Sequence, residues 1–116
     1  MAEVRQRALL GVDMARERRL WARERAELLR GSPPCTVGAR IDQVIPAEAC
    51  TRIATEVHHR RLIKQGGNLR TPANHALCCL RCHGAIHAHP ESARALGLIV
   101  AEGDPEWDEL GYGADR

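Results

Sequence analysis

The N-terminal part of the chain has the polar and apolar spacing of a surface helix. Residues 2–30 are rich in Arg, Glu, Ala and Leu, which favour helices, and they contain no proline. Asp13 is a suitable N-cap residue. Met14, Trp21 and Leu28 repeat every seven residues with arginines between them, so the apolar stripe is narrow. We expect this helix to dock on the domain through Trp21 and Leu28; an arginine arm on DNA and a dimerising seam are the alternatives.

The spacing becomes strand-like in the middle of the chain. Residues 31–34 (GSPP) form a linker, and we expect the compact domain to begin near Cys35. Residues 36–49 have short β-branched patches broken by a glycine and a proline, which predicts a loop with a weak strand pair. Apolar and polar side chains then alternate through RIATEVHH, which predicts a strand that ends at His58 and His59.

The second half of the chain alternates short elements with turns. A turn is expected at Lys64-Gln-Gly-Gly-Asn68. The pattern then predicts a strand over residues 76–79, a helix over residues 81–89, a second helix from Pro90 to Gly97, and an apolar packing segment over residues 98–100. Beyond Gly103 we expect a mobile acidic tail with Trp107 as its docking anchor.

Composition limits the hydrophobic core. The chain has 116 residues, and its aromatic side chains are Trp21, Trp107 and Tyr112. A domain this small needs disulfides or a metal to hold it together. We expect a metal, because no N-terminal apolar signal segment directs the chain to an oxidising compartment and Cys79-x2-Cys82 has the spacing of a metal knuckle. No run of about 18 apolar residues is present, so we expect a cytoplasmic protein with no membrane span.

Charge is unevenly distributed along the chain. Residues 1–101 hold 16 Lys and Arg against 9 Asp and Glu, a balance of +7. Residues 102–116 hold six acids and one Arg, a balance of −5. A basic body with an acidic tail suits a polyanionic partner, and ordinary solvated charge explains the pattern equally well.

Metal-binding side chains are concentrated in one segment. All six histidines and three of the five cysteines lie within residues 54–89. His83 and His87 are four residues apart in a predicted helix, so they share one face, as two ligands of one ion must. His58 and His59 end a strand and point in opposite directions, so one ring is able to complete a metal site while the other acts as a base.

The order of these residues resembles the HNH endonuclease motif of the ββα-metal superfamily, in its zinc-stabilised phage and mobile-element form. The matching features are a strand ending in His58-His59, a loop, Asn74, a second strand, Cys79-Leu-Arg-Cys82-His83, and His87 one turn further on. The resemblance covers residues 35 to about 90 and implies an α+β fold, a small ββα-metal (His-Me finger) core stapled by a structural zinc. It divides the chain into a charged helix and linker (1–34), a nuclease domain (35–101) and an acidic tail (102–116).

The resemblance also implies a role for each residue of the motif. His58, His83 and His87 would hold one catalytic divalent ion (Mg, Mn, Ni, Co or Zn), His59 would be the general base, and Asn74 would fix the direction of His59. The products would carry 5′-phosphate and 3′-hydroxyl ends. The phosphate backbone of double-stranded DNA would be contacted by five basic residues, Arg60, Arg61, Lys64, Arg70 and Arg81.

The cysteines take a structural role in this family. Cys35, Cys50, Cys79 and Cys82 would bind one structural zinc, although 14 residues separate the first two where relatives usually have two. Cys78 is expected to be a buried free thiol. His75 and His89 are expected to be surface or packing residues.

Three other functions fit parts of the sequence. One is a non-catalytic, zinc-stabilised nucleic-acid-binding module, which explains the cysteines but not His58, His59 and Asn74. A zinc deaminase would need a His-x-Glu that the chain lacks, since Glu56-Val57-His58 has the reverse order. The third is an accessory subunit that works with phage packaging proteins. For the nuclease we expect weak sequence preference and, if a phage encodes it, the host cytoplasm as its location; the oligomeric state is open.

Overall fold

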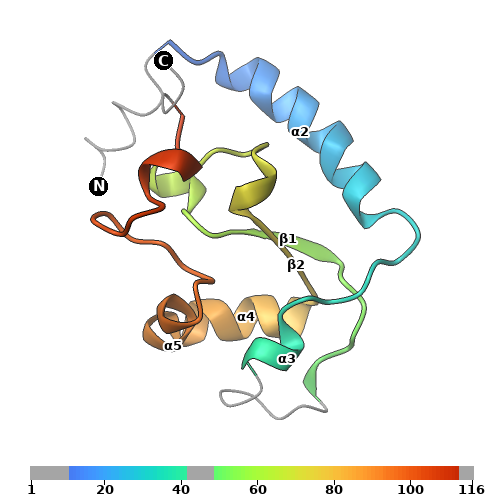
Figure 1. Cartoon of the computed structure of the whole chain (residues 1–116). Helices are drawn as coiled ribbons and strands as arrows, with labels where there is room; N and C mark the ends of the chain where they lie inside the picture. The colour runs from blue at the N-terminus through green and yellow to red at the C-terminus, as the bar shows by residue number, and fades with distance from the viewer. Residues whose placement is uncertain (1–10, 42–48, 113–116) are drawn as a thin grey trace.

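The protein has an α+β fold in which helices cover both faces of a small antiparallel sheet. The computed structural model describes residues 11–41 and 49–112. Its helices and strands are α2 (Met14–Leu29), α3 (Gly38–Ile41), β1 (Glu56–His59), β2 (His75–Cys78), α4 (Leu80–Ala88) and α5 (Pro90–Ala95). Short 3-10 helices lie at η2 (Ile63–Gln65), η3 (Pro72–Asn74) and η4 (Asp108–Leu110). In Figure 1 the sheet lies between α2 on one side and α4 with α5 on the other.

The register of the sheet decides which helix each histidine meets. His58 pairs with Ala76, and His59 pairs with His75. Side chains alternate between the faces of a strand, so His58 and His59 lie on opposite faces. The His58 ring packs against the rings of His83 and His87 on α4. The His59 ring packs against Trp21 of α2. Because both faces are covered, successive residues of β1 are buried, and the strand has no solvent face in its centre.

Helix α2 begins and docks largely as its sequence predicts. The Asp13 carboxylate accepts a hydrogen bond from the Arg16 amide at 3.1 Å, which caps the helix. The Trp21 ring lies 5.2 Å from that of His59 and 4.7 Å from that of His75, centroid to centroid. Leu28, the second expected docking residue, is covered only in part. It is 39% exposed and lines an open groove of about 530 Å³ between α2 and the loop before β2.

The strand predicted before the double histidine is shorter than its alternation implies. β1 covers only the last four residues of that segment. Arg52 has φ +70°, in the left-handed region, so the chain turns there, and Ile53 forms only an isolated bridge with Pro34. The predicted loop over residues 36–49 contains the short helix α3, and its residues 42–48 lie outside the described part of the chain.

The acidic C-terminal segment is packed rather than extended away from the domain. Trp107 and Leu110 are buried, at 6% and 0% exposure, as the predicted anchor role of Trp107 requires. The Arg61 guanidinium stacks 3.8 Å from the centroid of the Trp107 ring. Residues up to Tyr112 therefore belong to the folded domain, and the expectation of a mobile tail from Gly103 onward is wrong for them.

The hydrophobic core lies between the sheet and α4. Its largest members are Val37, Ile41, Ile86 and Leu98, and three cysteines are buried among them. The metal-knuckle cysteines are thus part of the core itself, as expected for a chain with few aromatic residues. Among the described residues, no helix is long and apolar enough to cross a membrane.

Candidate metal centres

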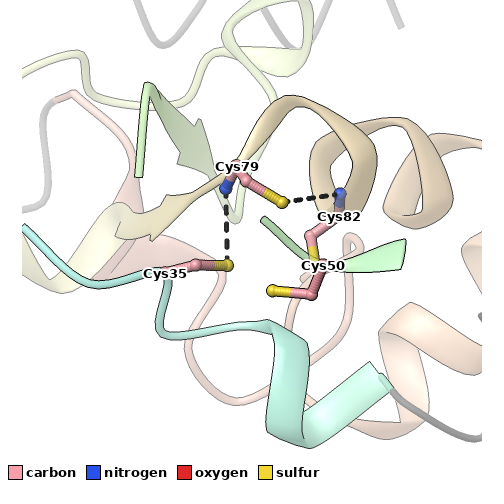
Figure 2. A group of neighbouring side chains, drawn as sticks. All are labelled: Cys35, Cys50, Cys79 and Cys82. Atoms are coloured by element: carbon pink, nitrogen blue, oxygen red, sulfur yellow. Dashed lines mark hydrogen bonds between the residues drawn. The ribbon is translucent and has the colours of Figure 1, made fainter. Parts of the chain in front are cut away.

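Four cysteines from three parts of the chain come together beside the start of α4. Their sulfur atoms all lie within 4.8 Å of one another, and the cluster consists of Cys35, Cys50, Cys79 and Cys82 (Figure 2). Four thiolates at about 2.3 Å from a tetrahedral zinc are separated by about 3.8 Å, so a small inward movement completes the site. The predicted grouping of the distant Cys35 and Cys50 with the knuckle pair is confirmed.

Backbone amides point at the sulfur atoms of this cluster. The Cys79 amide donates to Cys35 Sγ, and the Cys82 amide donates to Cys79 Sγ, each at 3.4 Å. The amide of Arg52 donates to Cys50 Sγ at the same distance, from a residue in the left-handed conformation. Such bonds stabilise thiolate over thiol, so the local backbone favours the form that binds metal.

The thiols in and beside this cluster differ in their ionisation. Burial raises the pKa of Cys82 and of Cys50, so these two ligands would lose their protons only as a metal binds. Burial opposes ionisation of Cys79, but hydrogen bonds from Cys82 and Thr51 outweigh it and hold the pKa of Cys79 at about 6. Burial raises the pKa of Cys78 to about 12. Cys78 therefore stays a neutral thiol inside the core, as its predicted role as a free buried cysteine requires.

Three histidines form a second cluster, between β1 and α4. The ligand nitrogens of His58, His83 and His87 lie within 4.8 Å of one another. The Nε2 atoms of His83 and His87 are 3.3 Å apart. His58 Nε2 lies 2.5 Å from the Leu98 carbonyl oxygen; since a carbonyl can only accept, this nitrogen donates and leaves Nδ1 for an ion.

The histidine cluster suits a divalent cation. Burial lowers the pKa of His58 to about 4, and burial also lowers the pKa of His87, so both rings are neutral at pH 7 and able to act as ligands. A carboxylate stands close by, with Glu56 Oε1 at 3.8 Å from His83 Nδ1. Within the described residues the site consists of three imidazoles and no carboxylate, a ligand set that favours Ni²⁺, Co²⁺ or Zn²⁺ over Mg²⁺.

His59 follows His58 on β1, and its ring lies on the opposite face of the sheet with one nitrogen anchored. Its Nε2 lies 3.0 Å from the carbonyl oxygen of Leu69 and donates to it. No hydrogen bond joins Nδ1 to the described residues, so its lone pair is not used by a donor among them. Burial lowers the pKa of His59 to about 4, helped by the nearby His75 and His83, so the ring is neutral at pH 7.

Asn74 makes the connections expected of a positioning residue. It is fully buried, and its Oδ1 accepts from the Arg61 amide at 2.7 Å. Its Nδ2 donates to the Arg61 carbonyl at 3.1 Å and to the Asn68 carbonyl at 3.0 Å. Asn74, just before β2, thereby holds together Arg61, two residues after His59, and Asn68, further along the same connection.

Three of the five predicted phosphate contacts have partners inside the protein. Arg61 is 4% exposed and donates to the carbonyls of Gln65 and Trp107, so its assignment to DNA is wrong. Arg60 bonds two carbonyls and pairs with Glu106, and Arg70 pairs with two glutamates of α2. Lys64 and Arg81 are exposed, as a phosphate contact requires.

No role beside His59 was expected from the sequence for two residues, His75 and Tyr112. His75, expected on the surface or in packing, faces His59 across the sheet with ring centroids 5.2 Å apart. Tyr112 is buried and accepts a hydrogen bond from the Leu69 amide. The register of the hairpin could have placed His75, but Tyr112 is 43 residues from its partner and no local pattern links them.

Comparisons with protein-family models, with curated proteins and with solved structures found no match to this chain. The two clusters and His59 are therefore the features that bear on the function of the protein.

Proposed function

We propose that the protein is a metal-dependent DNA endonuclease of the HNH type. The observation that carries the proposal is a histidine triad shared by β1 and α4, together with His59, the residue that follows the triad's His58 on β1 and whose Nε2 is anchored on a backbone carbonyl. A metal site alone would suit many functions. His59 adds what hydrolysis needs, a neutral group that takes a proton from water.

The proposed reaction divides its work between the triad and His59. His58, His83 and His87 would hold the divalent ion, which when bound supplies Lewis-acid stabilisation of the phosphate and of the departing 3′ oxygen. His59 Nδ1 takes a proton from a water molecule as the water oxygen bonds to phosphorus. The bond from phosphorus to the 3′ oxygen breaks, and the 3′ oxygen gains a proton from solvent. The products are a 5′-phosphate and a 3′-hydroxyl.

The surrounding residues prepare His59 for this step. Because Nε2 donates to the Leu69 carbonyl, the lone pair of the neutral ring is on Nδ1. Burial holds the pKa of the ring at about 4, so the ring is neutral and its Nδ1 lone pair is available to a water molecule at cellular pH.

The basic surface offered to DNA differs from the one expected. Lys64 and Arg81 remain candidates for phosphate contact near the site. Helix α2 adds four exposed arginines that form no ion pair with the described residues, and three of them, Arg16, Arg19 and Arg23, lie in one stripe. None of these contacts reads a base, so we expect weak sequence preference.

The test is nicking of supercoiled plasmid by zinc-loaded protein freed of other ions and then supplied with Mg²⁺, Mn²⁺, Ni²⁺, Co²⁺ or Zn²⁺. Wild type should nick with at least one ion, and His59→Ala should bind DNA and the ion without cutting. His89→Ala is the matched control, because His89 is exposed and lies outside the triad. DNA binding without cutting by the wild type with every ion would instead favour the zinc-stabilised binding module or the accessory packaging subunit.

A further inference from the structure

The imidazole rings of His59 and His75 both form a hydrogen bond with one backbone carbonyl, that of Leu69. His59 Nε2 lies 3.0 Å and His75 Nε2 lies 2.7 Å from the Leu69 oxygen. A carbonyl oxygen has two lone pairs and no proton, so both nitrogens donate to it. The position of this one oxygen therefore decides where the His59 ring points and which of its nitrogens carries the lone pair.

Leu69 lies in the connection between β1 and β2, outside any helix or strand. The C-terminal segment holds this connection from one side. Tyr112 Oη accepts from the Leu69 amide at 3.0 Å, and the Leu110 carbonyl accepts from the Asn68 amide at 2.7 Å. Gly67 and Gly111 form an antiparallel bridge one residue further along.

The other side of the connection is held by Asn74, through its bond to the Asn68 carbonyl. Asn74 contacts the residue before Leu69, whereas Tyr112 contacts Leu69 itself. Tyr112 is only 9% exposed, so water cannot readily replace its hydroxyl as the acceptor for the Leu69 amide. The C-terminal segment therefore makes the direct hydrogen bond to Leu69, the residue whose carbonyl anchors His59.

We infer that Tyr112, near the end of the acidic C-terminal segment, is a positioning residue for His59 and acts through Leu69. The role in cutting rests on the proposed nuclease function, but the positioning itself does not. Removing the hydroxyl leaves a buried amide without an acceptor, so Leu69 shifts toward water. The Leu69 oxygen then loses its alignment with both imidazoles.

The test compares Tyr112→Phe with Glu109→Gln, an exposed change in the same segment, in zinc-loaded, isotope-labelled protein. In wild type the Nε2 protons of His59 and His75 should give separate NMR signals, because a hydrogen bond slows their exchange with water. These signals should disappear in Tyr112→Phe and persist in Glu109→Gln. Persistence of both signals in folded Tyr112→Phe would overturn the inference, whether or not the protein cuts DNA.

Nicking supplies the second readout. Tyr112→Phe should lower kcat about tenfold and leave DNA affinity unchanged, because the variant alters the base and not the surface. An equal loss in Glu109→Gln would contradict a role specific to Tyr112. If Tyr112→Phe does not fold, hydrogen exchange on wild type decides: the Leu69 amide should be protected as strongly as the amides of β1, and rapid exchange would overturn the inference.

Discussion

The Nε2 atoms of His83 and His87 lie 3.3 Å apart, one turn from each other on α4. Two nitrogens bound at 2.0–2.1 Å to a tetrahedral ion are separated by about 3.3 Å. Without an ion, one neutral ring donates a hydrogen bond to the other, so the pair is held at the ligand spacing in either state. The site therefore needs little rearrangement to accept a metal.

The first prediction concerns that site. His87→Ala in zinc-loaded protein should weaken Ni²⁺ binding roughly a hundredfold or more, because one of three ligands is lost, while the zinc content stays at one ion per chain. Titration calorimetry and metal analysis measure the two quantities. His89→Ala should bind Ni²⁺ as wild type does. Equal Ni²⁺ affinity in wild type and His87→Ala would rule out the triad as the binding site.

The second prediction concerns the cysteine site. A Cβ added at Gly38 would lie 2.5 Å from Cys50 Sγ, whereas one added at Gly84 on α4 would meet nothing within 4 Å. Gly38→Ala should therefore push Cys50 from its place, lower stability by roughly 1–3 kcal/mol and speed the loss of zinc to a chelator. Gly84→Ala should stabilise α4 by up to about 1 kcal/mol. Zinc retention that is the same in both variants would show that Gly38 does not shape the cysteine site.

Local features of this structure could be predicted from the sequence. The Asp13 cap, the Cys79-x2-Cys82 knuckle and the pairing of His83 with His87 each depend on residues within about one helical turn. Chain geometry alone brings such residues together once a helix forms. The joining of Cys35 to the knuckle depended instead on a family resemblance, because no local rule connects residues so far apart.

Side chains with distant partners could not be predicted in this way. In the sequence Arg61 belongs to a basic run beside the double histidine, which is typical of a phosphate-binding rim. Its actual partner, Trp107, is 46 residues away, and the burial of both follows from the docking of the C-terminal segment. Charge patterns cannot distinguish an exposed arginine from one that stacks on an aromatic ring in the interior.

The third prediction uses this difference between arginines. Arg61→Gln should lower the free energy of unfolding by roughly 2–4 kcal/mol, because it removes a buried stacking contact and two hydrogen bonds. Arg81→Gln should leave stability unchanged and lower the salt slope of DNA binding by about 1, as the loss of one phosphate contact does. Urea unfolding and binding over a salt series measure the two effects. A stable Arg61→Gln variant with weakened DNA binding would reverse our assignment.

The last prediction concerns the outer face of α2. Glu17 and Glu24 turn toward the domain and pair with Arg70, at 3.0 and 2.8 Å, which fixes the rotation of the helix about its axis. The opposite face then presents Arg16, Arg19 and Arg23 to solvent, and 3.6 residues per turn place them in one stripe.

If this stripe contacts phosphates, replacing Arg16, Arg19 and Arg23 with glutamine should lower the slope of log affinity against log salt by up to about 2.7. A control variant with lysine at the same three positions keeps the positive charge, so its salt slope should match that of wild type. This control separates electrostatic attraction from any change in the packing of α2. Plasmid nicking at saturating DNA should be unaffected in both variants, because the stripe faces away from the pairing with Arg70 and from His59. An unchanged slope in the glutamine variant would mean that DNA approaches the metal site from the side of Lys64 and Arg81 alone.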